Sequence, residues 1–362
     1  MGLTVQLPKL NLDNIHLKGA YMLVFTGGCG YIGSSVARLF LERTDYKILL
    51  VDNLSTGFEI HAQTLKHYHP ERIEFALLDL KDTQALDTLF KSKRNQGQEI
   101  KGVLHFAAKL LVEESTRLPL AYYENNVCNT LQLAKLCAQH DIQYFLFSSS
   151  AAVYGQACAH VSEQTSLDPI NPYGASKMMS ERILLDSPLS CAILRYFNVA
   201  GATHFNDYST LFGLGQRAQN ATHLIKIACE CATHKRSSMG IFGTDYPTPD
   251  GTCVRDYIHI DDLALAHLEA FNTLLKTSQS EIYNVGYGRG YSVREVIEKV
   301  KEISGVDFKV KLQGRRAGDP ASLIADNTKI LSQTAFKPQF DNLENIIKSA
   351  YEWEKYLGVQ HA

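Results

Sequence analysis

A tyrosine and a lysine four residues apart, Tyr173 and Lys177, are the residues whose types and spacing point most directly to chemistry. In a helix this spacing puts the phenol and the ammonium on one face. A free tyrosine has a pKa of roughly 10, but a nearby positive charge favours the phenolate. Tyr173 could then take a proton from a hydroxyl group, so the pair predicts a general base.

Three consecutive serines, residues 148–150, follow an apolar run that ends at Phe147. If that run is a strand, the hydroxyls stand at its carboxyl end, where one of them can hydrogen-bond the reacting oxygen. We choose Ser150 among the three as the partner of Tyr173. Serines often begin loops, and a tyrosine and a lysine at helical spacing also arise by chance. The combination of both features favours a catalytic site.

A glycine-rich segment, TGGCGYIG at residues 26–33, follows an apolar run and leads into a helix pattern. Glycines let the backbone approach a pyrophosphate, which the N-terminal N–H groups of the helix can bind. Tight turns use the same residues, so the motif alone is a weak signal. Its place between an apolar run and a helix pattern makes it a predicted dinucleotide site.

Two acidic residues close the next apolar runs, and Asp52 is the more informative because it follows Gly33 by 19 residues. A carboxylate there can accept hydrogen bonds from ribose hydroxyls and would repel a 2′-phosphate, which favours NAD over NADP. Asp79, after the third run, can reach the adenine, although a simple turn carboxylate is an equally good interpretation.

The elements that must position these residues alternate as in a parallel sheet. Short apolar runs alternate with longer helix-compatible stretches, which is typical of strands covered on both faces. The predicted strands are 22–25, 47–51, 73–77, 103–106, 144–147 and 192–196. After residue 196 a second unit begins, with predicted helices at 223–233, 261–275 and 292–304 and a strand at 281–285. Ser292 with Glu295 forms a capping box at the start of the last helix, and Gly305 ends it.

These patterns predict an α/β fold, a Rossmann-like doubly wound parallel sheet with a smaller α/β substrate-binding domain. The ligand is expected at the carboxyl ends of the strands. The expected division has an N-terminal extension at 1–20 and an NAD-binding domain at 21–196 with a return segment at 238–270. Residues 197–237 and 271–362 form the expected substrate-binding domain.

Composition and charge limit the kinds of partner that the protein is expected to bind. The 362 residues carry a formal net charge of −2 and no long basic run, which argues against nucleic acid. No apolar run reaches the roughly 18 residues of a membrane helix, and no secretion signal is visible, so we expect a cytoplasmic protein that does not bind membranes. The eight cysteines lack metal-type spacing, so we expect reduced thiols and no metal site. No cysteine or carboxylate framework completes a metal site around His61, His67 and His69. We therefore predict that these histidines lie in a solvated loop.

Several nearly gap-free stretches make the chain resemble the extended short-chain dehydrogenase/reductases, and within them the UDP-sugar 4-epimerases. They are TGGCGYIGS from residue 26, HFAA from 105, NNV from 125, SSSAAVYG from 148, NPYGASK from 171, RYFNVAGA from 195 and FGTDYPTPDGTCVRDYIH from 242. The resemblance runs from Met22 almost to the C-terminus. It implies a homodimer with NAD as a bound cofactor and a UDP-hexose as substrate. The implied activity interconverts UDP-glucose and UDP-galactose.

The resemblance also implies residue roles. Tyr173 is the base, Lys177 holds the nicotinamide ribose and tunes Tyr173, and Ser150 assists at the 4-hydroxyl of the sugar. The implied cofactor contacts also include Gly27, Gly30, Tyr31, Ile32, Gly33, Asp52, Asn53, Asp79, Leu80, Phe106, Ala107, Ala108, Asn125, Ser148 and Tyr196. The implied contacts to the UDP-sugar also include Asn198, His223, Leu224, Phe242, Arg255, Arg316 and Asp319, with Phe242 near the uracil.

Three positions depart from the pattern of the relatives. Leu110 stands where some epimerases carry a lysine that contacts the pyrophosphate, with Lys109 just before it. Leu323 stands where a tyrosine or a smaller residue bears on the acceptance of N-acetylated sugars. His223 stands where many relatives have asparagine beside the nucleotide.

Three other functions would use the same NAD site. A nucleotide-sugar 4,6-dehydratase is disfavoured, because those enzymes place Asp-Glu after the serine or threonine, where this chain has Ala151 and Ala152. An epimerase of another UDP-sugar, with an N-acetylhexosamine, glucuronate or pentose, stays open. A non-catalytic NAD sensor would not need to keep Ser150, Tyr173 and Lys177 together.

Overall fold

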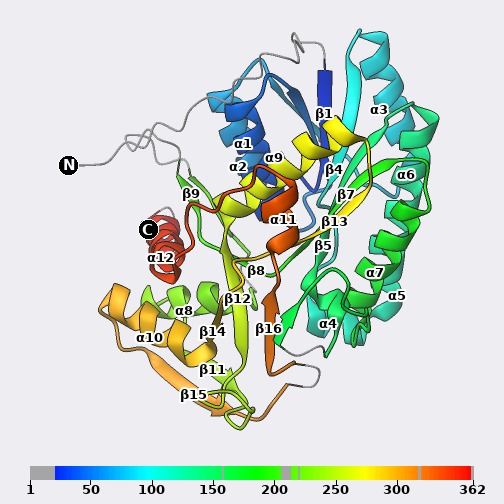
Figure 1. The fold of residues 1–362 in the computed structure, drawn as a ribbon. Helices are drawn as coiled ribbons and strands as arrows, with labels where there is room; N and C mark the ends of the chain where they lie inside the picture. Colours follow the sequence, from blue (N-terminus) through cyan, green and yellow to red (C-terminus); the bar gives the residue numbers. More distant parts are fainter. Residues whose placement is uncertain (1–20, 157–158, 205–212, 219–220, 317–318, 360–362) are drawn as a thin grey trace.

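The computed structural model describes residues 21–156, 159–204, 213–218, 221–316 and 319–359, so the expected extension at 1–20 lies outside the described residues. Within the described part, a parallel sheet of seven strands is covered by helices on both faces and stands beside a smaller unit (Figure 1). This architecture confirms the predicted Rossmann-like α/β class.

The strands of the large sheet coincide with the predicted apolar runs to within a few residues. They are β1 (Tyr21–Thr26), β2 (Lys47–Asp52), β3 (Ile73–Leu77), β4 (Glu99–His105), β5 (Tyr144–Ser150), β7 (Ser190–Tyr196) and β13 (Glu281–Val285). Their order is β13-β7-β5-β4-β1-β2-β3, and every pairing is parallel. From β1 the chain first adds β2 and β3 on one side of this strand, and it then returns to add β4 on the other side of β1. The loops that follow β1 and β4 therefore border the crevice where such sheets bind ligands.

Helices cover the two faces of the sheet because successive side chains of each strand point to opposite sides. On β1, Leu23 and Phe25 join one core cluster, and Met22 and Val24 join the other. The first face is covered by α1 (Tyr31–Arg43), α2 (Glu59–Tyr68) and α9 (Ile260–Thr277), and the second by α3 (Thr83–Asn95), α6 (Asn129–Gln139) and α7 (Pro172–Leu185).

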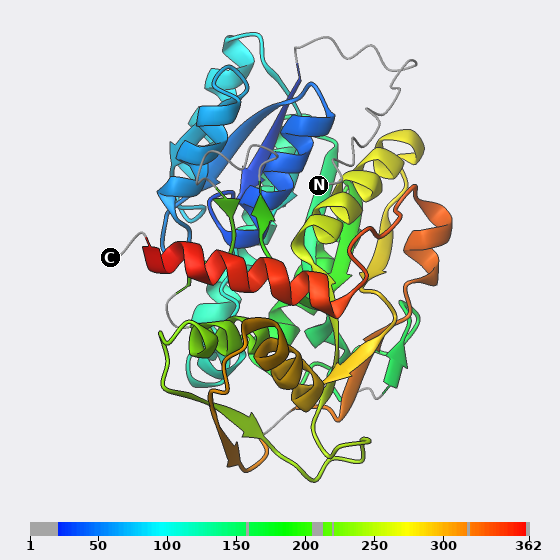
Figure 2. The same ribbon diagram turned by 90° about the vertical axis from the view of Figure 1, so that its left-hand side faces the viewer.

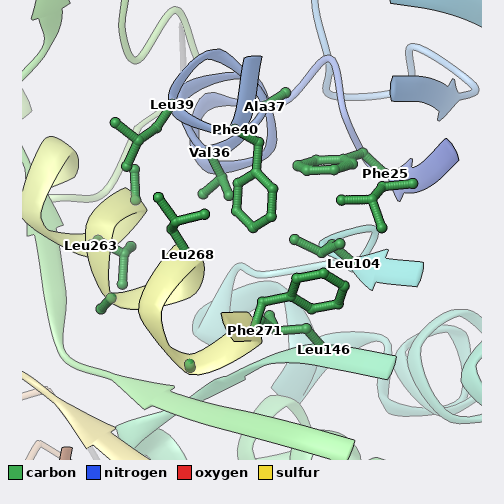
Figure 3. Packing of buried hydrophobic residues seen from close by; sticks show 14 of the residues in the cluster. Phe25, Val36, Ala37, Leu39, Phe40, Leu104, Leu146, Leu263, Leu268 and Phe271 are labelled. Atoms are coloured by element: carbon green, nitrogen blue, oxygen red, sulfur yellow. The ribbon is translucent and has the colours of Figure 1, made fainter. Parts of the chain in front are cut away.

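The core between α1 and α9 is built around aromatic rings (Figure 3). The rings of Phe25 and Phe40 meet edge to face with centroids 5.6 Å apart, and Phe271 lies 5.8 Å from Phe40. All three side chains are fully buried. Such pairs add to the stabilisation that burial alone provides, and they hold the glycine-rich loop after β1 on a rigid base.

One histidine prediction is wrong. His61 and His67 lie in α2, and His61 is 1% exposed, whereas we expected a solvated loop. The His61 ring nitrogen Nδ1 lies 2.9 Å from the carbonyl oxygen of Cys29, so the side chain braces the glycine-rich loop. A partner 32 residues away is a tertiary contact that the local sequence does not indicate.

The smaller unit is centred on β12 (Val254–His259), which pairs with β8 (Asn198–Ala200), β14 (Gly290–Ser292) and β16 (Ser322–Ala325). The remaining strand pairs are β16 with β6 (Ala159–Val161), β11 (Ser238–Phe242) with β15 (Lys309–Gln313), and β9 (Thr203–His204) with β10 (Gly213–Leu214). Its helices are α8 (Leu224–Ala232), α10 (Val293–Ser304) and α12 (Leu343–Val359), whereas α11 (Thr328–Gln333) packs against α9 and β13 of the large sheet. Figure 2 shows α12, in red, lying across the region where the two units meet.

The capping box of α10 is confirmed. The Ser292 hydroxyl accepts a hydrogen bond from the Glu295 backbone N–H at 3.1 Å, and the Glu295 carboxylate accepts one from the Ser292 N–H at 2.6 Å. Gly305 ends the helix with φ of 69°, a left-handed conformation that glycine adopts at low cost.

The placement of two segments differs from the expected division of the chain. The strand β13 extends the seven-stranded sheet beside β7, although 271–362 was expected to lie in the substrate-binding domain. Conversely, β11 and β12 belong to the small sheets, although they fall in the expected return segment 238–270. Apolar runs indicate where strands occur, but the sheet that each strand joins depends on pairing with distant residues. The domain division itself stays a prediction.

Candidate active site

Tyr173 and Lys177 lie near the start of α7, as predicted. The helix begins after Asn171, whose side chain accepts a hydrogen bond from the Gly174 N–H at 2.9 Å, and Pro172 occupies the first helical position. Lys177 is 3% exposed. Its Nζ donates to the Ser148 carbonyl oxygen at 2.7 Å, so the ammonium is anchored to the end of β5.

Ser150 is the serine that contacts Tyr173, as expected. Burial raises the pKa of Tyr173, and the hydrogen bond with Ser150 lowers it by a smaller amount. The protein alone therefore keeps Tyr173 as a phenol at neutral pH, and the expected phenolate depends on the positive charge of a bound nicotinamide as well as on Lys177. Burial also lowers the pKa of Lys177, to about 7, so the lysine lies close to losing its own charge.

The glycine-rich loop fits a bound pyrophosphate. A Cβ at Gly27 would lie 2.5 Å from the Ala107 nitrogen, and one at Gly33 would lie 2.4 Å from the Gly27 oxygen. A Cβ at Gly30 would meet only the Gly27 oxygen, at 3.2 Å, so this position borders open space. No side chain caps the N-terminus of α1 and its first turn has no acidic residue, which leaves its N–H groups for an anion.

The acidic residues after β2 and β3 lie at one edge of this loop. The Asp52 carboxylate accepts hydrogen bonds from the backbone N–H groups of Cys29 and Leu54, at 2.9 and 2.8 Å. The Asn53 amide donates to the Asp79 carboxylate at 2.8 Å. Each Asp52 oxygen keeps a further lone pair, so the residue can brace the loop and also accept from ribose hydroxyls.

The other expected cofactor residues surround the same crevice. The N–H groups of Phe106 and Ala107 both donate to the Thr26 oxygen, at 2.9 and 3.1 Å, which holds 106–108 against the loop. The Tyr31 hydroxyl instead donates to the Gly201 oxygen at 2.7 Å and links α1 to the second unit. The remaining residues lie in the first turn of α1 (Ile32), after β3 (Leu80), in the π-helix η1 at 123–128 (Asn125), and at the ends of β5 and β7 (Ser148 and Tyr196).

Four expected substrate residues lie together at the far end of the small sheets. The Arg316 guanidinium lies over the Phe242 ring, 4.7 Å from its centroid, and donates to Asp319 at 3.0 Å. An Arg255 nitrogen lies 3.8 Å from the same carboxylate. An aromatic ring beside two guanidinium groups can hold a nucleobase and a diphosphate. Leu323 lies opposite Arg255 in the pairing of β16 with β12.

The other three expected substrate residues, Asn198, His223 and Leu224, line one pocket between β8, α8 and α12. Phe242 and the arginines are not part of that pocket, so the structure brings the seven residues together as two groups. His223 lies at the N-cap of α8 without capping it, because its Nδ1 lies 2.9 Å from the Gln216 amide instead. Burial lowers the pKa of His223, so its ring is neutral at pH 7.

Lys109 lies beside Leu110, the position where some epimerases carry a lysine. Its Nζ lies 3.9 Å from the Glu114 carboxylate and 5.9 Å from the Tyr122 ring centroid, while the Leu110 side chain is exposed.

Among the described residues, no group of three or more His, Cys, Asp and Glu side chains could hold a metal ion. Within the same part of the chain, no helix is both long and apolar enough to cross a membrane.

Sequence reasoning missed several residues that hold the site together. Glu181 lies on the same face of α7 as Tyr173 and Lys177, and its spacing of four from Lys177 could have revealed it. The buried Asn126 side chain bonds the backbone N–H and carbonyl of Lys109 and the Ser176 hydroxyl. No local pattern separates Asn126 from its neighbour Asn125, because these partners are distant in sequence.

A Rossmann sheet, a glycine-rich loop at its crevice and a Ser-Tyr-Lys arrangement at the end of β5 together define a short-chain dehydrogenase/reductase. More narrowly, the chain belongs to the NAD dependent epimerase/dehydratase family, which it matches over residues 23–286.

The chain is similar to several known epimerases. It is 40% identical to a UDP-glucose 4-epimerase from Azospirillum brasilense over 340 residues, which cover 92% of each chain. The structure of the UDP-Glc/GlcNAc 4-epimerase from Campylobacter jejuni is 48% identical and covers 92% of this chain and 99% of that one, with a TM-score of 0.78. UDP-glucose 4-epimerase from Bifidobacterium longum, solved in complex with NAD+ and UDP, is 30% identical with a TM-score of 0.82 and covers 92% of this chain and 98% of its own.

Proposed function

We propose that this protein is an NAD-dependent epimerase that interconverts UDP-glucose and UDP-galactose through a 4-keto sugar. The observation that carries the proposal is the contact of Ser150 with Tyr173 beside the buried Lys177, at the carboxyl edge of a sheet that also carries the glycine-rich loop. Several relatives that are similar over more than nine-tenths of the chain are UDP-glucose 4-epimerases, which supports the hexose substrate, and others with the same coverage are UDP-arabinose 4-epimerases.

NAD, when bound, supplies a group that takes a hydride from the sugar C4 and returns it. The glycine-rich loop and the N-terminus of α1 would hold its pyrophosphate, and Asp52 its adenosine ribose. Ser148 and Lys177 would lie at the nicotinamide end, because Ser148 stands near the carboxyl end of β5 and Lys177 on α7 donates to its carbonyl oxygen. The other proposed contacts are those implied by the resemblance, with Tyr31 contributing through its backbone because its hydroxyl is bonded to Gly201.

The side chains of the protein move the proton and orient the sugar. Tyr173 takes the proton from the 4-hydroxyl through its Oη, and Ser150 donates a hydrogen bond to the same sugar oxygen. Lys177 adds positive charge that favours the phenolate of Tyr173. Arg255 and Arg316 grip the diphosphate, so the hexose itself is held loosely and can present either face.

A second candidate is the same reaction on UDP-N-acetylhexosamines. The similar protein from Campylobacter jejuni is a UDP-Glc/GlcNAc 4-epimerase. In this chain, Leu323 stands at the position that bears on the acceptance of N-acetylated sugars. A panel of UDP-galactose, UDP-N-acetylgalactosamine, UDP-glucuronate and UDP-xylose separates these activities. Conversion of UDP-xylose alone would replace the hexose proposal.

Replacing Tyr173 with phenylalanine tests the mechanism. We expect Tyr173→Phe to lower the conversion of UDP-galactose by roughly 10²- to 10⁴-fold, because general-base catalysis contributes about that much. The conversion is followed without added cofactor, and Tyr351→Phe on α12 serves as the control that should keep its activity. Normal turnover in Tyr173→Phe would overturn the mechanism.

We propose further that the protein is a cytoplasmic homodimer. The seven described cysteines are free thiols, which supports a reducing compartment. Exposed apolar side chains gather on α4 (Val112–Arg117), α5 (Pro119–Tyr122) and α7, elements that pack against one another. They are Val112, Leu118, Leu120, Met179 and Leu185, and Leu110 lies just before α4. Exposed apolar side chains on helices that pack together are consistent with a subunit interface.

A further inference from the structure

Glu181 extends the row of Tyr173 and Lys177 by one more turn of α7. Residues spaced by four lie on one face of a helix, and this face is turned toward the end of β5. Each of the three serines that end β5 contacts one member of the row. The contacts are Ser148 with Lys177, Ser149 with Glu181 and Ser150 with Tyr173.

The Glu181 carboxylate is buried with a charged partner. It accepts hydrogen bonds from Arg195 Nε at 2.9 Å and from Nη2 at 2.6 Å, and both side chains are 3% exposed. The third guanidinium nitrogen, Nη1, donates to the Tyr154 hydroxyl at 3.1 Å. Leaving a buried charge without its partner is strongly destabilising, so each side chain of this pair depends on the other.

The position of this pair gives it a use beyond holding α7 on the sheet. Lys177 is buried, and its Nζ donates to the Ser148 carbonyl oxygen and lies 4.8 Å from the centroid of the Phe147 ring, so both of these contacts are with uncharged groups. Burial lowers the pKa of Lys177, and the Glu181 carboxylate one turn away raises it. The protonated state of Lys177 therefore depends on a carboxylate that does not touch the reacting groups.

We propose that Glu181, held by Arg195 and Ser149, is a positioning residue that keeps Lys177 protonated and so sets the upper pH limit at which Tyr173 can act. This inference rests on the proposed function for its activity readout. It assigns no contact between Glu181 and the substrate or the cofactor.

Other ionisable groups lie on the elements around α7. On β4, His105 is neutral at pH 7 because burial lowers its pKa to about 3. The titratable side chains on the elements packed against α7 are Tyr144 on β5, Tyr154 on the 3₁₀ helix η2 (Ala151–Tyr154), Cys191, Arg195 and Tyr196 on β7, Glu113, Glu114 and Arg117 on α4, Tyr122 on α5, Tyr123, Glu124 and Cys128 on η1, and Lys135 and Cys137 on α6. Glu181 is the charged group that shifts the pKa of Lys177.

Glu181→Gln removes the charge and preserves the shape of the side chain. Without the carboxylate, and with the Arg195 cation left unpaired nearby, Lys177 should lose its proton at lower pH. We expect the alkaline limb of kcat/KM for UDP-galactose to move down by roughly one pH unit, the size that a nearby charge typically gives. Ser149→Ala removes one contact of Glu181 and keeps its charge, so its alkaline limb should stay where the wild type has it.

A second readout does not depend on the substrate. In protein labelled with ¹³C at the lysine Cε, the Lys177 signal is assigned by its absence from Lys177→Met, and its titration midpoint is followed by NMR. We expect a lower midpoint in Glu181→Gln than in the wild type. Wild-type protein that leaves UDP-galactose unchanged would contradict the proposed function, while the NMR midpoints would still test the role of Glu181.

The double variant Glu181→Gln with Arg195→Gln removes the buried pair as a whole and guards against a single variant that does not fold. We expect its midpoint to lie below that of the wild type by less than in Glu181→Gln, because no unpaired cation remains. A midpoint and an alkaline limb equal to those of the wild type, in either variant, would overturn the proposal. A fall in activity of equal size at every pH would likewise show that Glu181 only supports the fold.

Discussion

At the scale of single residues, burial and neighbouring charges decide what the catalytic groups can do. Burial works against the charged forms of both Tyr173 and Lys177, raising the pKa of the first and lowering that of the second. The spacing of the two residues predicted their proximity to one another. It did not predict that the protein alone would hold Tyr173 as a phenol, because the spacing carries no information about desolvation.

Arg316 illustrates a residue that should act on binding and leave the chemical step unchanged. It is stacked on Phe242 and paired with Asp319 in the small unit. We expect Arg316→Ala to raise KM for UDP-galactose by about tenfold or more with kcat nearly unchanged, because a hydrogen bond to a charged group contributes about 1.5–3 kcal/mol. Steady-state kinetics measure both constants.

Arg182→Ala provides the matched control, since this arginine is exposed and pairs with Asp186 on the outside of α7. Its KM should equal that of the wild type. A fall in kcat at constant KM in Arg316→Ala would place this residue in the chemical step and contradict the expectation.

At the scale of elements, the turn from β1 into α1 shows how close packing fixes residue types. The carbonyl oxygen of Gly27 lies close to where a Cβ on Gly33 would be. The loop and the helix can therefore approach this closely only because position 33 is a glycine. The glycine spacing in the sequence was sufficient to predict this turn, because the geometry it requires is local.

Gly33→Ala should disrupt this turn. Its Cβ would lie 2.4 Å from the Gly27 oxygen, so we expect a loss of about 1–3 kcal/mol of stability, as for other overpacked sites, and loss of bound NAD. Thermal unfolding measures the first effect, and the absorbance of cofactor released from purified protein measures the second.

The comparison variant is Gly314→Ala, at a glycine with no heavy atom within 4 Å of an added Cβ. It should unfold at the wild-type temperature and retain its cofactor. A Gly33→Ala protein that behaved in the same way would mean that the loop can relax around the extra methyl group.

At the scale of the whole molecule, buried titratable groups couple stability to pH. Burial lowers the pKa values of His61, His105 and His267 to about 4, 3 and 4. Below pH 6.5 the unfolded chain binds protons at these sites and the folded chain does not, so stability is lost as the pH falls. Asp256 opposes this trend, because burial raises its pKa to about 6 and protonation then favours the folded state.

The histidines should dominate this balance. Between pH 7 and pH 5 each costs about 2 kcal/mol, while Asp256 returns about 1 kcal/mol over the same interval. We therefore expect a lower urea midpoint at pH 5 than at pH 7, measured by circular dichroism. Equal midpoints at the two pH values would show that these histidines gain protons in the folded state.

The proposed dimer can be tested on the apolar patch of α4, α5 and α7. Leu120 is 80% exposed, so Leu120→Asp costs the monomer little and should prevent the association. Sedimentation velocity should report a dimer for the wild type and a monomer for this variant. Leu312→Asp, at an exposed leucine on β15, should remain a dimer.

Features that depend on residues close together in the chain could be predicted before the fold was known. The strands of the large sheet, the glycine-rich turn, the row of Tyr173 and Lys177 and the capping box of α10 all follow from periodicity and short spacing.

Contacts between distant residues became visible only in the fold. It placed β13 beside β7, buried His61 beneath the glycine-rich loop, and paired Glu181 with Arg195 below Lys177. These contacts join residues whose partners lie 14 to about 90 positions away, and they form only when the helices pack on the sheet. Local patterns carry no record of these partners, so the pairing of Glu181 with Arg195 emerged only from the folded chain.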